Sequence, residues 1–237
     1  MRRQTPDLHR ADELLGPAAA ASLVAVDPAT VIALCESMVT DERRARLQHV
    51  IERRLASVVV VLDGPHDPHN GAAVLRSCDA FGVQHLHVVE RYEPFLAART
   101  VAKGSEQWVD AHTYSSTDRL LEVLSGGRFE LVATEADGEL LPNDLRSISR
   151  LALVVGNERE GIAPDLRRHC RRAVRVPMVG FVDSLNLSVS TAILLSAATV
   201  ERAGDLSLEE RQRLYARGLY LTVPRAAEVL LAARRHP

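Results

Sequence analysis

The stretch SVVVVLDGPHDPHNGAAVLRSCDAFG, residues 57–82, decides the fold class. Residues 58–62 form an apolar run without polar alternation, which is typical of a strand buried on both faces of a parallel sheet. The Gly-, Pro- and Asp-rich residues 63–70 predict a loop. Residues 72–81 predict a helix, with Gly82 at its C-terminal cap. A strand followed by a loop and a helix is the repeating unit of a parallel α/β fold.

The same alternation continues along the chain and predicts a parallel sheet with helices on both faces. Ligands of such sheets bind at the carboxyl ends of the strands. We therefore expect the chemistry in the loops that follow residues 62, 134, 155 and 176. The further predicted strands are residues 85–89, 130–134, 151–155 and 174–176, and the further predicted helices are residues 118–124, 164–169 and 188–202.

Both ends of the chain predict helical extensions of this core. Residues 1–28 are rich in Ala, Pro and Arg and predict a loosely held arm. Two short amphipathic helices are expected between residues 28 and 55, and two more at residues 208–214 and 225–235. The expected organisation is an N-terminal arm and helical extension (1–55), an α/β domain (56–204) and a C-terminal helical extension (205–237).

The charge balance excludes a strongly basic protein. The 29 lysines and arginines are offset by 31 acidic residues, so any nucleic-acid contact has to be local. Arginines cluster at two places, and each cluster is open to two interpretations: a solvated helix face, or a positive surface for an RNA backbone. The first cluster is Arg43, Arg44, Arg46, Arg53 and Arg54, and the second contains Arg167, Arg168 and Arg171.

Cysteine usage predicts a cytoplasmic protein. Cys35, Cys78 and Cys170 are odd in number and form no C-x-x-C pair, which disfavours a disulfide framework and a structural zinc site. We expect no bound metal. The start of the chain lacks the pattern of a signal peptide, and the apolar run 189–200 is too short to span a bilayer. No membrane association is expected.

Missing motifs exclude several enzyme classes. The sequence contains no G-x-x-x-x-G-K-[ST] phosphate loop and no G-x-G-x-x-G after the first strand, so neither a P-loop nucleotide hydrolase nor a nicotinamide dehydrogenase is supported. H-E-x-x-H and G-x-S-x-G are absent as well.

The first polar motif opens the helix that follows the first strand. Asn70 lies where an N-cap is expected, and capping is the simpler explanation of this residue. Arg76 interrupts an otherwise small and apolar helix. Helical side chains lean toward the N-terminus, so we expect its guanidinium to reach the loop near Asn70.

Two further polar motifs follow later strands. Residues 153–164, LVVGNEREGIAP, place Glu158 between Gly156 and Gly161, although a charged turn with incidental glycines is the alternative. Glycine allows a backbone to approach a ligand closely. Residues 176–188, VPMVGFVDSLNLS, place several hydroxyl and amide groups before a helix, of which Ser184 or Ser188 alone would be a helix cap.

The three motifs, in this order, resemble those of the SpoU/TrmH family of RNA 2′-O-methyltransferases in the SPOUT superfamily. The resemblance covers about residues 50–202. It implies an α/β-knot, in which the C-terminal part of a parallel sheet threads a deep trefoil knot that binds S-adenosylmethionine. It also implies that residues 56–204 are the methyltransferase domain, and that the protein is a homodimer with its active site beside the subunit interface.

The resemblance also assigns site residues. Arg76 is similar to the catalytic arginine of the family, with Asn70 as its partner. Glu158 matches the second motif, and Ser184 and Asn186 match the third. A guanidinium effectively never deprotonates, so stabilising a phosphate or a developing alkoxide is the easier role for Arg76 than that of a general base. Backbone groups of Thr134, Gly156, Val176, Met178 and Leu185 would hold the cofactor.

The resemblance extends to a substrate class. Residues 80–89 and 104–109 are similar to the branch that methylates guanosine 18 in the D-loop of tRNA. Asp183 departs from the glutamine typical of that branch, and about 25 N-terminal residues have no counterpart in it. RNA, and not DNA, is the expected partner. Ribosomal RNA as the substrate, including in an antibiotic-resistance enzyme, and a non-catalytic RNA-binding knot protein stay open as alternatives.

Overall fold

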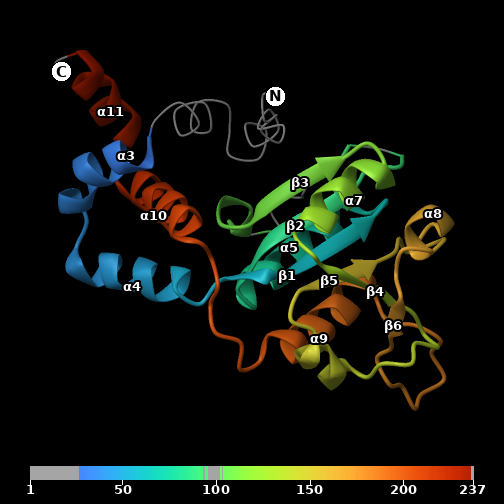
Figure 1. Cartoon of the computed structure of the whole chain (residues 1–237). Helices are drawn as coiled ribbons and strands as arrows, with labels where there is room; N and C mark the ends of the chain where they lie inside the picture. Colours follow the sequence, from blue (N-terminus) through green and yellow to red (C-terminus); the bar gives the residue numbers. More distant parts are fainter. Residues whose placement is uncertain (1–26, 93, 96–101, 103, 236–237) are drawn as a thin grey trace. The chain divides into compact units, whose positions relative to one another are not determined.

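The computed structural model describes residues 27–92, 94–95, 102 and 104–235 (Figure 1). The chain divides into two compact units. One unit, Leu55–Ala203, contains the sheet; the other is helical and combines the segment that ends at Arg54 with the segment that begins at Gly204. The predicted arm, residues 1–28, lies outside the described residues except for Asp27 and Pro28.

The α/β unit contains one six-stranded sheet in which every paired strand is parallel to its neighbour, in the order β3-β2-β1-β5-β4-β6. The sequence pattern does not predict β3, because its residues DAHTY are polar and half-buried at the edge of the sheet. The strands are β1 (Leu55–Asp63), β2 (Val83–Val89), β3 (Asp110–Tyr114), β4 (Glu130–Thr134), β5 (Leu151–Val155) and β6 (Arg172–Val174).

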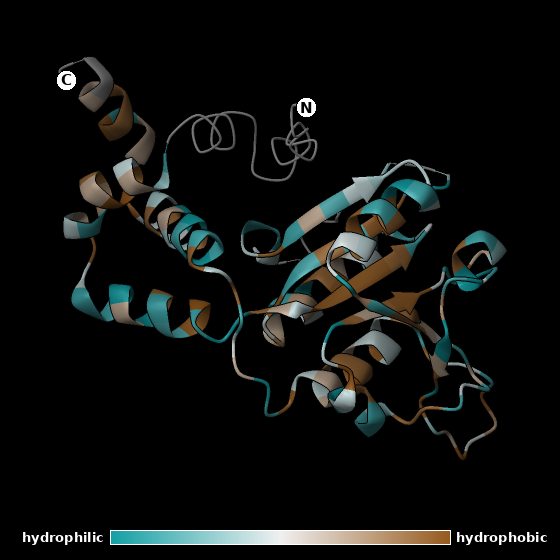
Figure 2. Cartoon of the chain, in the orientation of Figure 1, coloured by the Kyte–Doolittle hydropathy of each residue, from teal (hydrophilic) through white to brown (hydrophobic). Residues whose placement is uncertain are grey.

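Helices cover both faces of the sheet, as predicted. On β1, Val58 and Val60 join the core formed with α5 and α9, whereas Val59 and Val61 face the core formed with α7 and α8. This two-sided burial explains the continuous apolar run, and Figure 2 shows the central strands as strongly hydrophobic. The helices are α5 (Pro68–Ala80), η3 (Ser105–Gln107), α7 (Thr117–Gly126), η4 (Pro142–Ser147), α8 (Pro164–Arg167) and α9 (Leu187–Thr199).

The helical unit is built from elements at the two ends of the described chain. Its helices begin at side-chain caps: Thr40 Oγ1 accepts from the Arg43 amide at 3.2 Å, and Ser207 and Glu210 form a capping box. No described helix is long and apolar enough to cross a bilayer. The elements are α3 (Pro28–Cys35), η2 (Glu36–Met38), α4 (Asp41–Ile51), α10 (Leu208–Thr222) and α11 (Ala226–Arg235).

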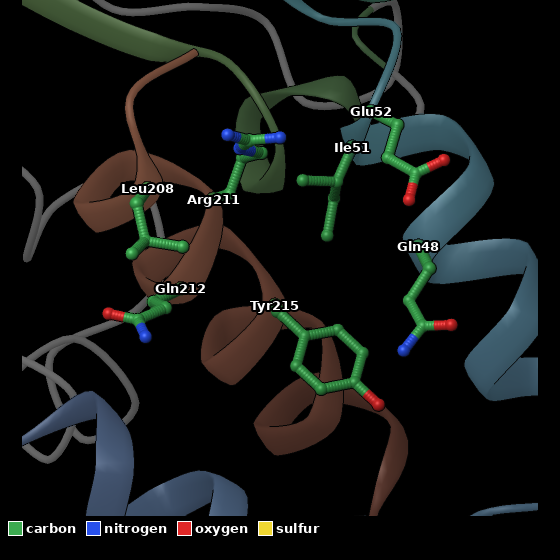
Figure 3. A pocket seen from close by; sticks show the side chains of 7 residues that line it. All are labelled: Gln48, Ile51, Glu52, Leu208, Arg211, Gln212 and Tyr215. Atoms are coloured by element: carbon green, nitrogen blue, oxygen red, sulfur yellow. The ribbon is translucent and has the colours of Figure 1, made fainter.

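A cavity of about 250 Å³ lies between α4 and α10 within the helical unit (Figure 3). None of the residues predicted to be catalytic or to bind the cofactor lines it. The residues predicted to be catalytic or to bind the cofactor lie instead in the α/β unit. The lining residues are Gln48, Ile51, Glu52, Leu208, Arg211, Gln212 and Tyr215.

A buried histidine, His87, lies on β2. Its Nδ1 atom is 2.8 Å from the Tyr114 hydroxyl, and its ring stacks on that of His112 with centroids 5.1 Å apart. Burial, followed by the charges of His112 and His85, lowers the pKa of His87 well below its ordinary value of 6.5. Burial raises the pKa of Tyr114 to about 12. The tyrosine hydroxyl therefore stays protonated and shares a hydrogen bond with a neutral imidazole.

Acidification is expected to destabilise the protein through His87. The unfolded chain takes up this proton near pH 6.5 and the folded chain only at lower pH, so the free energy of unfolding falls as the pH drops below about 6.5. The loss reaches up to about 1.4 kcal/mol per pH unit for one proton. Urea unfolding between about pH 7 and pH 5 measures it. His87→Phe combined with Tyr114→Phe should flatten this dependence, and an equally steep dependence in the double variant would contradict the assignment.

Candidate active site

Three predicted catalytic residues, one from each motif, meet in the α/β unit. Asn70 Nδ2 donates to Glu158 Oε1 at 2.6 Å, and Asn186 Nδ2 donates to Asn70 Oδ1 at 3.0 Å. Asn70 lies on α5, Glu158 in the loop after β5, and Asn186 at the start of α9. The three motifs thus converge beyond the carboxyl ends of the strands, where ligands of parallel sheets bind.

The residues that cap the helices differ from the prediction. Asn70 does not cap α5, and its side chain contacts Glu158 instead. α5 begins at Pro68, and its N-cap is Asp67, whose Oδ1 accepts from the His69 amide at 2.8 Å. The same backbone hydrogen bond is the main reason why the pKa of Asp67 is lowered. The capping interpretation of Asn70 is therefore wrong. In the third motif the cap is Asn186, whose Oδ1 accepts from the Ser188 amide at 2.9 Å, rather than Ser184 or Ser188.

The loop that presents Glu158 is shaped by Asn157, which the sequence analysis did not single out. Asn157 Oδ1 accepts from the amides of Arg159 and Glu160 at 2.9 and 2.7 Å. Its backbone exchanges two hydrogen bonds with Gly161, whose φ of 71° lies in the left-handed region. Asparagine between two glycines is a turn signal that could have revealed this role.

Gly156 is needed by the loop itself, whether or not a ligand binds there. We expected close approach of its backbone to a ligand. In the structure a Cβ atom at this position would overlap the backbone of Gly161 and Ile162. The absent side chain therefore lets the loop fold back on the end of β5, which makes Gly156 a requirement of the loop itself.

Asp63 supports the same loop from the end of β1. Its side chain is fully buried, its Oδ2 accepts from the Ala163 amide at 2.7 Å, and its Oδ1 forms an ion pair with Arg91. Arg91 also forms an ion pair with Asp165 at 2.9 Å. This network was not predicted from the sequence, although a carboxylate that ends an apolar strand at the carboxyl edge of a sheet is a signal for it.

Loss of the Asp63 carboxylate should disorganise the loop. Asp63→Ala leaves the Arg91 guanidinium and the Ala163 amide without this partner, and breaking a buried ion pair typically costs about 3–5 kcal/mol. We expect a lower unfolding temperature and weaker cofactor binding, measured by calorimetry. Glu122→Ala is the matched control, because its ion pair with Arg119 is exposed. Equal behaviour of the two variants would contradict the role of Asp63.

Two predicted catalytic residues do not join the cluster. Arg76 and Ser184 are exposed, and within the described part of the chain neither makes a hydrogen bond or an ion pair. The expected reach of Arg76 to Asn70 is not observed. Six positions along a helix separate two side chains by about 120° around its axis, so the two residues point to different sides of α5.

The residues predicted to hold the cofactor lie at the ends of three adjacent strands. Thr134 ends β4 and pairs with Val174 of β6, and Gly156 follows β5. The Thr134 hydroxyl is buried and has no hydrogen-bond partner within the described residues. Buried polar groups are normally paired, so this orphaned hydroxyl fits a polar ligand at the site. Val176, Met178 and Leu185 are half-buried in the following loop.

The predicted RNA-binding arginines divide by exposure. Arg54 is buried and follows the end of α4, so its placement on an exposed basic helix face is wrong. Arg167 is engaged by Glu135 through two hydrogen bonds of 2.6 and 2.8 Å, which favours the ion-pair interpretation for this residue. Arg43 and Arg44 are half-buried, with Arg43 Nε donating to Thr222. The exposed members of the two clusters are Arg46, Arg53, Arg168 and Arg171.

Fold and site together define a class of protein: a parallel α/β protein with an amide–carboxylate cluster and an unpaired buried hydroxyl at the carboxyl edge of its sheet. Residues 57–196 of this chain match the model of the SpoU rRNA Methylase family. The chain belongs to this family.

Relatives and solved structures agree with this membership. The chain is 32% identical over 178 residues to the tRNA (guanosine(18)-2′-O)-methyltransferase of Thermus thermophilus, covering 74% of this chain and 90% of that protein. It is 31% identical to the enzyme of the same name from Aquifex aeolicus, over 78% of this chain and 92% of that protein.

Two crystal structures have a similar fold. The A. aeolicus TrmH/SpoU tRNA modifying enzyme has a TM-score of 0.68 at 29% identity and covers 78% of this chain and 98% of its own. The SpoU methyltransferase AviRb from Streptomyces viridochromogenes, in complex with AdoMet, has a TM-score of 0.56 at 25% identity and covers 62% of this chain and 60% of its own.

Proposed function

We propose that the protein transfers a methyl group from S-adenosylmethionine to the ribose 2′-hydroxyl of guanosine 18 in the D-loop of tRNA. The convergence of Asn70, Glu158 and Asn186 carries this proposal, together with the orphaned hydroxyl of Thr134 at the end of β4. The shared activity of the Thermus and Aquifex relatives supports the substrate.

In this reaction the cofactor supplies an electrophilic methyl group, and the protein positions the ribose and assists loss of the hydroxyl proton. Asn70, Glu158 and Asn186 form a connected set of donors and acceptors that can orient the ribose. Arg76 contacts the phosphate next to the target and stabilises the developing alkoxide, because a guanidinium stays charged. Ser184 completes the site when RNA is bound. Thr134 and the backbone around Gly156, Val176, Met178 and Leu185 hold the cofactor.

We further propose a homodimer with the active site beside its interface. Support comes from α9 and its C-cap, where the apolar side chains Val189, Ile193 and Val200 are exposed. An apolar stripe of this kind is typical of a surface that a second subunit covers. Arg76 is exposed on α5, the helix that packs against α9, so a dimer formed there would bring it close to a neighbouring subunit.

The deep trefoil knot is part of the same proposal. The loop between β4 and β5 contacts segments that follow it in the chain: a Cβ atom at Gly138 would lie 2.6 Å from the carbonyl carbon of Val174, and Arg202 donates to the Ile148 carbonyl at 2.5 Å. Contacts between this loop and two later segments of the chain are expected where the chain is threaded through it. Residues 56–204 would then be the methyltransferase domain, with helical extensions at 1–55 and 205–237.

A cytoplasmic location is supported by cysteine chemistry. Cys35, Cys78 and Cys170 are all buried as free thiols. Unpaired cysteines are the normal state of proteins in a reducing compartment.

Two measurements test the proposed function. Calorimetry with S-adenosylmethionine should give a 1:1 binding isotherm per chain, and absence of heat would refute the enzyme. Mass mapping of methylated nucleosides, in RNA from cells with and without the gene, should show loss of 2′-O-methylguanosine at tRNA position 18.

Methylation of ribosomal RNA is the second candidate, favoured by the description of the matching family model. Loss of a ribosomal methyl group alone would establish it.

RNA binding should depend on the exposed arginines of the helical unit. Reversing Arg46 and Arg53 to Glu is expected to weaken RNA binding and to reduce the slope of log K against log salt by about 1.5, since each phosphate contact contributes about 0.7 to 0.9. Fluorescence anisotropy against salt measures both. Arg119→Glu with Arg128→Glu is the control, because both residues are exposed on the α/β unit. An unchanged slope in the first variant would remove these arginines from the RNA surface.

A further inference from the structure

A stacked pair of aromatic rings, one half-buried and one exposed, is linked by hydrogen bonds to the proposed catalytic cluster. His66, in the loop after β1, and Tyr92, after β2, stack with ring centroids 4.4 Å apart and an interplanar angle of 23°. Tyr92 is 52% exposed. One face of the phenol ring rests on the imidazole, and about half of the surface of Tyr92 is exposed.

Two glutamates of one loop connect this pair to the catalytic cluster. Glu158, which accepts from Asn70, also accepts from the His66 amide at 3.4 Å through its other oxygen. Glu160 accepts from the Tyr92 hydroxyl at 2.5 Å. This hydrogen bond is the main reason why the pKa of Tyr92 is raised, so the ring stays a neutral phenol. Glu158 and Glu160 thus link the stacked pair to the cluster around Asn70.

The surrounding charges select the kind of ligand. Glu158 and Glu160 would repel a phosphate, whereas a neutral planar base can stack on an aromatic ring without this cost. Proteins that recognise single-stranded RNA commonly stack unpaired bases on Tyr and His. The surface beside the cluster thus suits the base of a nucleotide better than its backbone.

The glutamates also favour one base. A carboxylate only accepts hydrogen bonds. Guanine presents two neighbouring donors, N1–H and the N2 amino group, on its Watson–Crick edge, whereas adenine presents one donor, the N6 amino group, next to an acceptor at N1 that a carboxylate oxygen would repel. Glu160 uses one oxygen for Tyr92, and its other oxygen can accept from the edge of a base stacked on that ring.

We propose that His66, Tyr92 and Glu160 form a subsite for the guanine base of the nucleotide that is methylated. Tyr92 stacks on the base, His66 supports the ring from behind, and Glu160 accepts from its edge. The subsite holds the target base out of the RNA stack while Asn70, Glu158 and Asn186 meet the ribose. This inference rests on the proposed function.

Steady-state methylation of a D-loop RNA tests the stacking. Tyr92→Ala is expected to raise KM for RNA by about 5- to 100-fold, the range that loss of one base–aromatic stack produces. Tyr92→Phe keeps the ring and should stay within about threefold of wild type. Affinity for S-adenosylmethionine, measured by calorimetry, should not change in either variant. Equal KM values for Tyr92→Ala and wild type would overturn the subsite.

A second variant tests recognition of the base edge. Glu160→Gln replaces one carboxylate oxygen with a hydrogen-bond donor. The ratio of kcat/KM for an RNA with guanosine at the target position to kcat/KM for one with adenosine should fall. An unchanged ratio would overturn the role of Glu160. The wild-type protein separates the two proposals. If it methylates no RNA, the proposed function fails and the subsite fails with it; if it methylates RNA normally while Tyr92→Ala does too, only the subsite fails.

Discussion

Replacing Arg76 with alanine is expected to lower kcat by about 10²- to 10³-fold, the usual effect of removing one group that stabilises developing negative charge. Arg76 is exposed on α5 and engages no described side chain. The variant should therefore keep its fold, with an unfolding free energy within about 0.5 kcal/mol of wild type. Because Arg76 is proposed to face the RNA, affinity for S-adenosylmethionine should stay within a few-fold. Single-turnover methylation and calorimetry measure the two quantities.

Arg119→Ala is the matched control for Arg76. Arg119 is likewise an exposed helical arginine, but it lies on α7, which packs on the opposite face of the sheet, and among the described residues its ion pair is with Glu122. This control should retain full activity. An Arg76→Ala enzyme with normal turnover would refute the catalytic assignment.

Replacing Gly156 with valine is expected to abolish cofactor binding. The new side chain would overlap the backbone of Gly161 and Ile162, and backbone atoms cannot move aside as a flexible side chain can. The loop that carries Glu158 would have to open, at a cost of about 1–3 kcal/mol in unfolding free energy, as is typical of overpacking. Calorimetry with S-adenosylmethionine and thermal unfolding measure the two effects.

Gly180→Ala is the control for this substitution. Gly180 lies in the third motif, but a Cβ atom there meets no other atom within 4 Å, so the variant should bind the cofactor as wild type does. Normal cofactor affinity in Gly156→Val would show that the loop tolerates rearrangement and would contradict the steric requirement.

The class of fold could be predicted from local patterns. The uninterrupted apolar run at residues 58–62 predicts a doubly buried parallel strand, and β1 has residues that point into both cores. A strand buried on both faces lacks the usual alternation of apolar and polar residues. The composition of such a short segment therefore indicates that it lies inside the sheet. β3 escaped prediction because an edge strand is only half-buried and needs no apolar residues.

The sequence by itself also determined the three polar motifs, because glycine, amide and carboxylate residues at strand ends mark sites of ligand binding, and the resemblance of these motifs in their order indicated the family. Only the tertiary structure decided which of these residues meet. Asn70 contacts Glu158 and Asn186, whereas Arg76 points elsewhere, and Tyr92 pairs with Glu160 across 68 positions of sequence. These contacts depend on the insertion of β5 beside β1. Local periodicity carries no information about strand order, since that order is set by how distant segments pack around the shared core.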